Sequence, residues 1–533
     1  MLPIIGIIND KERLTMNQGR FISRNARYWP DRPAILFGDR AITFKELDER
    51  SSRLANALLS LGAKKGDRIG VQSWNRPELI ELECALYKAG LVKVAVNARL
   101  SQAEVIDTIS NAEPVVMIAG PGHVASIAAL APTFSTVRHC IAFGADHEGF
   151  LNYEDLLQKA SVDNPDVDMA PDDLAVLHYT SGSTGKLKAA MQTVGNRMAS
   201  LRKVVMGRLR AGPGDVLALA GQITHASGMF IQPFLFQGGT VLLHERFEPD
   251  NFLGSIEKHR VTACFLVPTM INMLVAHPRV KDYDLRSLKQ VTYGSAPMAP
   301  SRIREAWQVF GPVLSQGYGA GETTGGLVAL TTADHRDAIE GNQEALLSSC
   351  GRVFSESELR LVDDDGAEVA PGEVGEIVIR GPDVFAGYWR EPELSAAAIK
   401  DGWLHTGDLA RQDDHGFVYI VDRKKDMVIS GGFNVYPSEI EQAMYRHPAV
   451  YEVCVIGIPD PIWGEAIKAV VVVREGHAVT DAELIEHCRS LLADFKKPRS
   501  VDFVAELPKN SNGKLSRKEV KERYWSGQER RVA

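Results

Sequence analysis

The sequence has little that would support a cysteine-based fold. Its 6 cysteines are spread singly along 533 residues, and no C-x-x-C pair occurs. Structural zinc sites and disulfide frameworks both need cysteines at characteristic spacings. Neither feature is therefore expected to organise this chain, and single cysteines are typical of a reducing compartment.

Long apolar runs and a basic excess are also absent. No stretch approaches the roughly 18 apolar residues that suggest a membrane-spanning helix. The apolar segment 2–8 lacks the basic flank and the cleavage-like site of a signal peptide. A net charge of −8 gives no general attraction to nucleic acids or anionic membranes. We expect a cytoplasmic protein with no integral membrane segment and no nucleic-acid partner.

A chain of 533 residues is too long for one hydrophobic core, so two or more domains are expected. Helix and strand patterns alternate over residues 42–293, which predicts β-α-β units around a largely parallel sheet. From about residue 355 the pattern changes to short strands around turns. A predicted strand at 416–421 stops at the charged cluster 422–426. A compact α+β unit follows this cluster, which is the predicted domain boundary.

Residues 178–189 predict a phosphate-binding segment. The apolar strand 174–177 leads into small and hydroxylated residues from Thr180 to Gly185, followed by Lys186 and Lys188. Backbone N–H groups, hydroxyls and ammonium groups of this kind can surround an anion. The Walker pattern G-x-x-x-x-G-K-[ST] does not fit, because Thr180 stands at its first glycine and Leu187 follows the lysine.

This segment resembles the signature loop of the adenylate-forming superfamily, which includes acyl-CoA synthetases, luciferases and peptide-synthetase adenylation domains. Its pattern is Y-T-S-G-[ST]-T-G-x-P-K-G, and Leu187 and Ala189 replace the proline and the last glycine. Other motifs resemble those of the superfamily in the same order along nearly the whole chain. In Q-x-Y-G-x-T-E, Gly321 replaces the threonine. The similar segments are 224–228, 294–298, 316–323, 403–408 (W-x-x-T-G-D), 422–426 with 430–435, and 508–514 (P-[KR]-x-x-x-G-K).

The resemblance implies an α/β, multidomain α+β fold. A large N-terminal AMP-binding domain over residues 1–424 would contain β-α-β sheet subdomains and a small β-barrel. A small, mobile α+β C-terminal domain would occupy residues 425–533. In this superfamily the small domain rotates between two half-reactions, and Lys425 is the expected hinge residue.

The resemblance also implies an ATP-dependent acyl-CoA synthetase that uses Mg²⁺ and coenzyme A. A carboxylic acid and ATP would give acyl-AMP and pyrophosphate, and the thiol of CoA would then give acyl-CoA and AMP. Because the carboxylate and the α-phosphate repel each other, lysines, oriented N–H groups and Mg²⁺ are needed between them. The residues expected to bind ATP or CoA are Thr180, Ser181, Gly182, Ser183, Thr184, Gly185, Lys186, Lys188, Gly294, Ser295, Ala296, Gln316, Gly317, Tyr318, Gly319, Glu322, Asp408, Arg423, Lys425, Gly431 and Gly432.

Three residues are expected to act directly in the reaction, namely Lys514, Glu322 and His225. Lys514 would join the acyl carboxylate and the α-phosphate through its ammonium group, a compact and flexible charge. Glu322 and Thr184 would hold magnesium, which prefers hard oxygen ligands. His225 lies where the superfamily has a histidine beside the acyl pocket.

Other expected roles belong to nucleotide and thiol binding. Asp408 would accept hydrogen bonds from the ribose hydroxyls, assisted by Arg423. Tyr318 would stack near the adenine. Gly431 and Gly432 would line the tunnel for the thiol.

The acid and the acceptor are less narrowly defined. The sequence ends at Ala533, shortly after Lys514, so we expect no fused carrier domain. Segment 224–227 has no aspartate to pair with an α-ammonium group, which favours a free carboxylic acid over an amino acid. A medium- or long-chain fatty acid is the expected substrate. An aryl acid remains an alternative substrate, and a separate acyl carrier protein remains an alternative acceptor. The protein could also form a homodimer.

Overall fold

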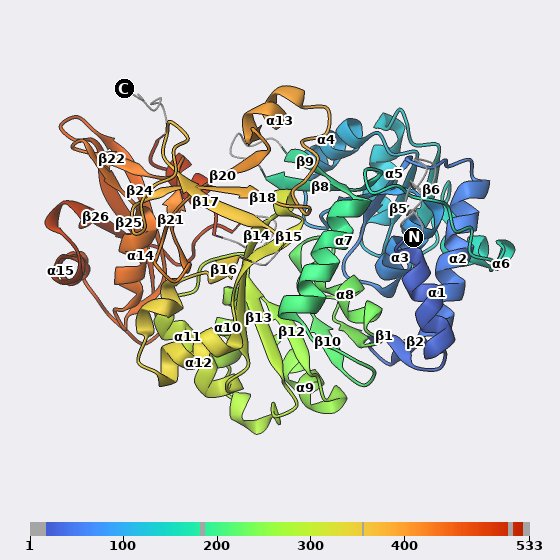
Figure 1. Ribbon diagram of the computed structural model, residues 1–533, viewed down its shortest axis with the longest axis horizontal. Coiled ribbons are helices and arrows are strands. Elements are labelled where there is room, and N and C mark those ends of the chain that lie inside the picture. The colour runs from blue at the N-terminus through green and yellow to red at the C-terminus, as the bar shows by residue number, and fades with distance from the viewer. Residues whose placement is uncertain (1–16, 182–186, 354–355, 510–514, 526–533) are drawn as a thin grey trace, which may run out of the picture.

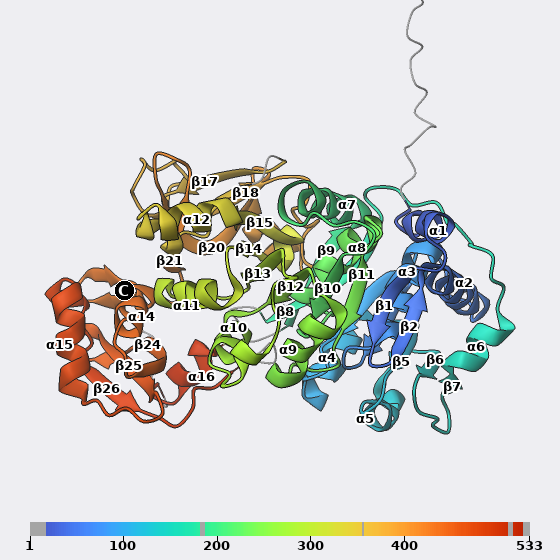
Figure 2. The same ribbon diagram turned by 90° about the horizontal axis from the view of Figure 1, so that it is seen from below.

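The protein is described here by a computed structural model that covers residues 17–181, 187–353, 356–509 and 515–525. Its strands form four β-sheets. Figures 1 and 2 show the C-terminal sheet, in orange and red, at one end of the molecule and the blue-to-cyan sheet at the other. None of the helices in the described segments combines the length and the apolar composition that a membrane crossing requires.

The largest sheet has nine strands and is mostly parallel from β1 to β14. Its N-terminal strand pair lies beside β11, so the chain enters this sheet, leaves it and returns. In order across the sheet, the strands are β16 (Arg352–Val353), β15 (Gly325–Leu330), β14 (Leu314–Ala320), β13 (Gln290–Gly294), β12 (Ala263–Leu266), β10 (Val216–Leu219), β11 (Thr240–Leu243), β1 (Pro33–Phe37) and β2 (Arg40–Thr43).

The chain between β2 and β10 builds a second, seven-stranded sheet, parallel except for its last strand. Across the sheet the strands are β7 (Leu151–Asn152), β6 (His139–Ala142), β5 (Val116–Ala119), β3 (Arg68–Gln72), β4 (Val92–Val96), β8 (Leu174–Ser181) and β9 (Leu187–Thr193). The β8–β9 hairpin is thus at one edge of this sheet. The predicted β-α-β alternation is present in both large sheets.

Two five-stranded sheets follow. The first is antiparallel and consists of β17 (Glu358–Val362), β18 (Gly375–Arg380), β19 (Ile399–Lys400), β20 (Trp403–Gln412) and β21 (Val418–Arg423). The second is the C-terminal sheet of β22 (Val428–Ser430), β23 (Phe433–Val435), β24 (Val450–Asp460), β25 (Gly464–Val473) and β26 (Ser500–Phe503). The predicted domain boundary lies in the turn between β21 and β22.

Helix starts follow local signals in the sequence. Capping boxes begin α2, α4, α7, α12 and α15, for example Thr43 with Glu46, and proline begins several others. The helices are α1 (Gly19–Tyr28), α2 (Phe44–Ser60), α3 (Pro77–Ala89), α4 (Gln102–Ala112), α5 (Val124–Leu130), α6 (Tyr153–Lys159), α7 (Val194–Lys203), α8 (Ile231–Phe236), α9 (Pro249–His259), α10 (Pro268–Val275), α11 (Pro300–Phe310), α12 (Thr332–Glu340), α13 (Pro392–Ala398), α14 (Pro437–Tyr445), α15 (Asp481–Leu491) and α16 (Arg517–Glu522).

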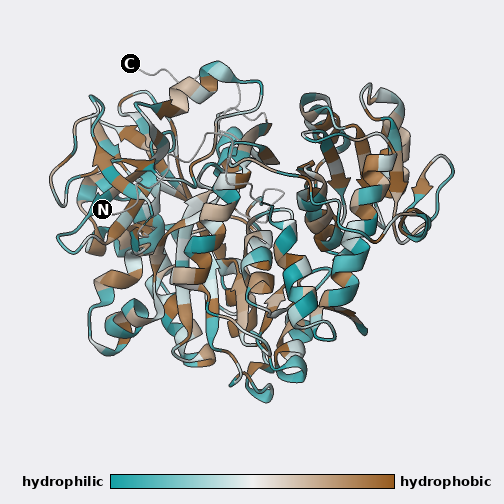
Figure 3. Cartoon of the chain, turned by 45° about the vertical axis from the view of Figure 1, so that its right-hand side comes forward, coloured by the Kyte–Doolittle hydropathy of each residue, from teal (hydrophilic) through white to brown (hydrophobic). Residues whose placement is uncertain are grey.

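The two large sheets share a hydrophobic core. Residues of α1, α2, α3 and α8 pack in it against strands of both sheets, such as Val71 of β3 and Leu217 of β10. On their other faces, α9–α12 cover the nine-stranded sheet and α4–α5 cover the seven-stranded one. Figure 3 shows the strands as largely brown, hydrophobic ribbons, while the helices carry both colours. Each large sheet is therefore buried on both faces, as parallel sheets are.

Two predicted boundaries were wrong. The strand predicted to stop at 421 continues to Arg423, because Asp422 and Arg423 pair with Leu409 and Asp408 of β20. The strand predicted over 174–177 continues to Ser181, because its later residues pair with β9. Thr180 and Lys188 therefore lie opposite each other on paired strands, and residues 182–186 between these strands lie outside the described part of the chain.

One buried ion cluster ties the boundary turn to the C-terminal sheet. The Arg517 guanidinium lies 3.4 Å from Asp422 and from Asp426, and 2.7 Å from Glu441 of α14. Burial alone lowers the pKa of Arg517, but these carboxylates outweigh it and leave the pKa well above its usual value. Asp422 also accepts a hydrogen bond from the Ser438 backbone N–H at the start of α14. Loss of the guanidinium would leave buried carboxylates without their partner.

We expect Arg517→Met to destabilise the protein by about 3 kcal/mol, the usual cost of breaking a buried ion pair. Arg489→Met is the matched control, because Arg489 of α15 has a 58% exposed side chain and pairs with the exposed Glu486. That change should cost less than about 0.5 kcal/mol. Denaturant unfolding of the full chain measures both variants, and equal losses would contradict the role assigned to Arg517.

Candidate active site

The candidate site forms where the two large sheets meet. The β8–β9 hairpin of the seven-stranded sheet contacts the short helix η5 (Gly321–Thr323), which follows β14 of the nine-stranded sheet. The Gln192 side-chain amide of β9 donates a hydrogen bond of 2.9 Å to the Gly321 carbonyl. The predicted phosphate segment and the predicted magnesium ligand Glu322 are thereby held next to each other.

A segment after β18 fixes both Glu322 and the hairpin. The Phe385 N–H donates to the Glu322 carbonyl over 2.8 Å, and the Tyr388 hydroxyl donates to Glu322 Oε1 over 2.9 Å. Burial and the Glu322 charge raise the pKa of Tyr388, so its hydroxyl stays a donor. The same segment bonds to β9 through the carbonyls of Ala189 and Met191. Glu322 therefore presents its second carboxylate oxygen from a fixed position.

Lys188 of β9 lies close to Tyr388. Its ammonium group is 5.6 Å from the centre of the Tyr388 ring. Tyr179 has a different role from its neighbours, since it points into the core and donates to Asn111 Oδ1 over 2.6 Å. Its contribution to the hairpin is therefore structural.

Asp408 of β20 is held by two partners. The Tyr318 hydroxyl donates to Asp408 Oδ2 over 2.6 Å, and the Arg423 guanidinium lies 3.4 Å from Oδ1. Burial, together with the Asp408 charge, raises the pKa of Tyr318 well above its usual value. Tyr318 thus orients the carboxylate, which retains acceptor positions for a diol. A stacking role for Tyr318 at adenine stays a prediction.

The segment expected along the adenine is built by close backbone approach. A Cβ atom on Gly294 would lie 2.4 Å from the Gly317 carbonyl oxygen, so the ends of β13 and β14 require glycine there. Ser295, which precedes Ala296, has a positive φ of 69°, an uncommon conformation for a residue with a side chain. Gln316 accepts a bond of 3.3 Å from Tyr293. Gly319 is equally restricted, since its Cβ would lie 1.8 Å from the Gly325 carbonyl oxygen.

Two histidines lie together at this junction. His225 begins the short helix η3 (Ala226–Phe230), and its Nδ1 is 2.9 Å from the Thr224 hydroxyl. Its ring centre lies 5.5 Å from that of His178 on β8. The nearby Met229 faces Gly325, whereas Phe230 is buried and stacks on Phe265. Gln192 and Tyr388 lie at this junction and were not named from the sequence. His178 falls inside the predicted phosphate segment 178–189, but no role was predicted for it.

The C-terminal residues lie in the boundary turn and the last sheet. Partial burial, Arg423 and Lys188 lower the pKa of Lys425, while Asp426 and Asp408 act in the opposite sense. Gly431 and Gly432 form the β22–β23 turn with positive φ values of 59° and 81°. A Cβ on Gly431 would lie 2.5 Å from the Trp463 ring, so this turn also requires glycine.

Some predicted residues lie outside the described part of the chain, namely Gly182, Ser183, Thr184, Gly185, Lys186 and Lys514. Among the residues that are described, no group of three or more His, Cys, Asp or Glu side chains could hold a metal alone. In proteins Mg²⁺ is usually held by one or two carboxylates plus substrate phosphates. Glu322 has the hard oxygen that such an ion requires.

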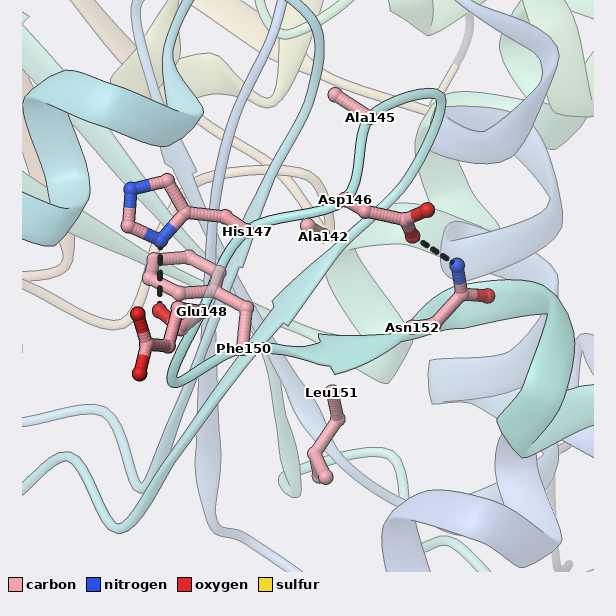
Figure 4. Close-up of a pocket in the computed structure, with 8 residues that line it drawn as sticks. All are labelled: Ala142, Ala145, Asp146, His147, Glu148, Phe150, Leu151 and Asn152. Carbon is pink, nitrogen blue, oxygen red and sulfur yellow. Dashed lines mark hydrogen bonds between the residues drawn. The ribbon is translucent and has the colours of Figure 1, made fainter.

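A separate surface pocket lies at the opposite edge of the seven-stranded sheet from β9. Figure 4 shows that the β6–β7 loop and the adjoining strand residues supply its lining, with Asp146 bonded to Asn152 and His147 to the Glu148 carbonyl. These polar groups bond to one another rather than pointing together into the pocket. We assign it no function.

Comparison with known proteins agrees with this geometry. The family model described as AMP-binding enzyme matches residues 22–389, and that for the AMP-binding enzyme C-terminal domain matches 439–514. A feruloyl-CoA synthase of Amycolatopsis sp. is 38% identical over 95% of this chain and 99% of its own length. A medium/long-chain-fatty-acid–CoA ligase of Mycobacterium tuberculosis is 34% identical over 94% of this chain and 89% of its own length.

A solved structure gives the same result for the fold. ATP-bound MatB from Rhodopseudomonas palustris superposes with a TM-score of 0.86 at 32% identity, over 96% of this chain and 99% of its own. The chain therefore belongs to the AMP-binding enzyme family. Within this family it is an AMP-forming acid–thiol ligase that uses ATP, Mg²⁺ and coenzyme A. The predicted superfamily, fold class, activity and cofactors are confirmed.

The contacts of Asp408 give a test of the nucleotide site. We expect Asp408→Asn to raise the KM for ATP by about tenfold or more, since hydrogen bonds to charged groups contribute about 1.5–3 kcal/mol. Asp413→Asn is the matched control, because Asp413 also accepts a tyrosine hydroxyl, that of Tyr419, but at the other end of the β20–β21 pair. Steady-state kinetics with ATP varied measure both, and an unchanged KM in Asp408→Asn would remove Asp408 from the site.

Proposed function

We propose that this enzyme converts an aryl carboxylic acid into its CoA thioester at the junction of the two large sheets. The observation that carries the location is the convergence of Thr180, Lys188 and Glu322 through the Gln192–Gly321 bond. Identity of 38% to a feruloyl-CoA synthase, against 34% to the fatty-acid ligase, supports an aryl acid. This choice departs from the fatty acid expected from the sequence.

The first half-reaction joins two anions. A carboxylate oxygen of the acid attacks the α-phosphorus of ATP, and the bond to pyrophosphate breaks. Thr180, Lys188 and the predicted residues 182–186 would hold the phosphates. Asp408 and Arg423 would hold the ribose. Mg²⁺ bound at Glu322 would supply positive charge against the phosphate oxygens. Lys514 would complete the neutralisation between carboxylate and α-phosphate.

The second half-reaction replaces AMP by the thiol. The CoA sulfur attacks the acyl carbon, and the bond from that carbon to the AMP oxygen breaks. We propose that the residues from 425 onward rotate for this step about Lys425. The glycine turn of Gly431 and Gly432 would then line the thiol path. A rotation hinge is a short segment that absorbs a large change in φ and ψ. The short turn between β21 and β22 supports placing the hinge at Lys425.

A fatty acid is the second candidate substrate. The Mycobacterium tuberculosis relative, named for medium- and long-chain fatty acids, is similar over 94% of this chain. The apolar Met229, which faces Gly325, suits either an aryl ring or an alkyl chain. Transfer to a separate acyl carrier protein remains the alternative acceptor. A cytoplasmic location and a homodimer stay predictions.

An acid panel distinguishes these candidates. We expect ferulate and cinnamate to give a kcat/KM at least about tenfold above octanoate and palmitate, a difference of about 1.4 kcal/mol in transition-state binding. Pyrophosphate release is measured for each acid, with CoA and with phosphopantetheinyl carrier protein in turn. A preference for octanoate or palmitate would favour a fatty acid as the substrate. Pyrophosphate release that requires the carrier protein would show that this protein, and not CoA, is the acceptor.

Lys514→Ala tests the assignment of the two half-reactions. It should abolish ATP–pyrophosphate exchange, because the charge between the two anions is lost, yet spare thioester formation from supplied acyl-AMP. Lys518→Ala is the control, since Lys518 in α16 has a 62% exposed side chain. Normal exchange in Lys514→Ala would contradict the assignment.

A further inference from the structure

Gly321, the residue that departs from the superfamily threonine, is explained by its surroundings. A Cβ atom on Gly321 would lie 2.6 Å from His178 Cδ2, 2.9 Å from Thr180 Cγ2 and 3.3 Å from His178 Nε2. Real Cβ atoms do not approach other atoms to 2.6 Å. The His178 imidazole therefore occupies the space that a side chain at position 321 would need.

Strand geometry places His178 beside the phosphate segment. Alternate residues of a strand share a face, so His178 lies on the same side of β8 as Thr180. Leu177 and Tyr179, on the other side, are buried in the core with α4. His178 is only half-buried and lies three residues before Ser181, the last residue of β8. Its ring is thus on the face of the hairpin that η5 covers.

The backbone around Gly321 is fixed on both sides of that contact. Gln192 holds the Gly321 carbonyl, and the Phe385 N–H holds the next carbonyl, that of Glu322. The His178 ring also lies against His225, with ring centres 5.5 Å apart and planes at 67°. The His178 ring therefore lies between the Gly321 backbone and the His225 ring. The geometry is a built arrangement of one glycine and one imidazole.

We propose that His178 donates a hydrogen bond from Nε2 to the phosphate of the acyl-adenylate, in place of the side chain that Gly321 lacks. The inference rests on the ATP site proposed above. A ring N–H is a good donor to a phosphate oxygen, and such a bond to an anion is stronger than one between neutral groups. The ring edge that carries Cδ2 and Nε2 faces Gly321, beside the Thr180 side chain. An oxygen held by these groups is therefore within reach of His178.

The competing explanation is that the imidazole only fills space. In that case any side chain of similar volume at either position would serve, and the phosphate would gain nothing from Nε2. The two explanations differ for ligands with and without a phosphate. They also differ for replacement side chains with and without a donor.

AMP and adenosine are the probes, and calorimetric binding to the full-length protein is the measurement. We expect His178→Ala to weaken AMP binding by about tenfold or more while adenosine affinity stays within about twofold, because the lost bond is to a charged group. His178→Ala with Gly321→Thr should recover most of the AMP affinity, because a hydroxyl then stands at position 321. His178→Ala with Gly321→Val, which has the shape of threonine but no hydroxyl, should not.

The outcomes separate the two proposals. Equal recovery by the threonine and valine variants, or equal loss of AMP and adenosine, would show that His178 fills space only. Unchanged AMP affinity in His178→Ala would also overturn the inference while leaving the ATP site in place. Failure of the unaltered protein to bind AMP would overturn the proposed site itself. Thermal unfolding of each variant checks that loss of binding is not loss of the fold. His178→Gln is added as a variant that removes the imidazole but keeps an N–H donor.

Discussion

The site depends on one close approach, that of the β8–β9 hairpin to η5. The two elements belong to different sheets, and the Gln192 amide joins them at the Gly321 carbonyl. The large shared core holds the sheets in this relation, and glycine at 321 leaves room for the side chains of His178 and Thr180. Residues from distant parts of the chain thereby meet at the junction where we propose that ATP binds. Without this contact, Thr180 and Glu322 would belong to two unrelated surfaces.

The sequence allowed much of this arrangement to be predicted, because local signals and motifs agreed. Capping boxes and prolines mark helix starts such as Thr43, and the motif order selected Asp408 and Glu322 as candidate site residues. The partners of those residues were not predictable in the same way. Tyr388 and Gln192 lie outside the motifs, and they reach Glu322 and Gly321 only through tertiary folding. Strand ends were also missed, because pairing rather than local composition extends β8 and β21.

Charge is distributed differently in the two halves of the chain. At the β8–β9 hairpin, the Lys188 ammonium group lies 5.6 Å from the centre of the Tyr388 ring, and we propose that it meets the phosphates of ATP. In the boundary turn the charges satisfy one another, since Arg517 neutralises Asp422, Asp426 and Glu441. A turn whose carboxylates are paired with α16 can hold the C-terminal sheet in a defined orientation. The helix that carries this arginine begins three residues after Lys514 in the sequence.

The contact between His178 and Gly321 makes the identity of each residue contingent on the other. A homologue with threonine at the second position needs a smaller or differently placed group at the first, although the two lie far apart in the sequence. When position 321 is considered alone, its glycine looks like the loss of a motif residue, which is the kind of change used to identify inactive paralogues. When positions 178 and 321 are considered together, our proposal is that His178 takes over the role of the missing side chain. Annotation of adenylate-forming enzymes from single motif positions would therefore misclassify chains built in this way.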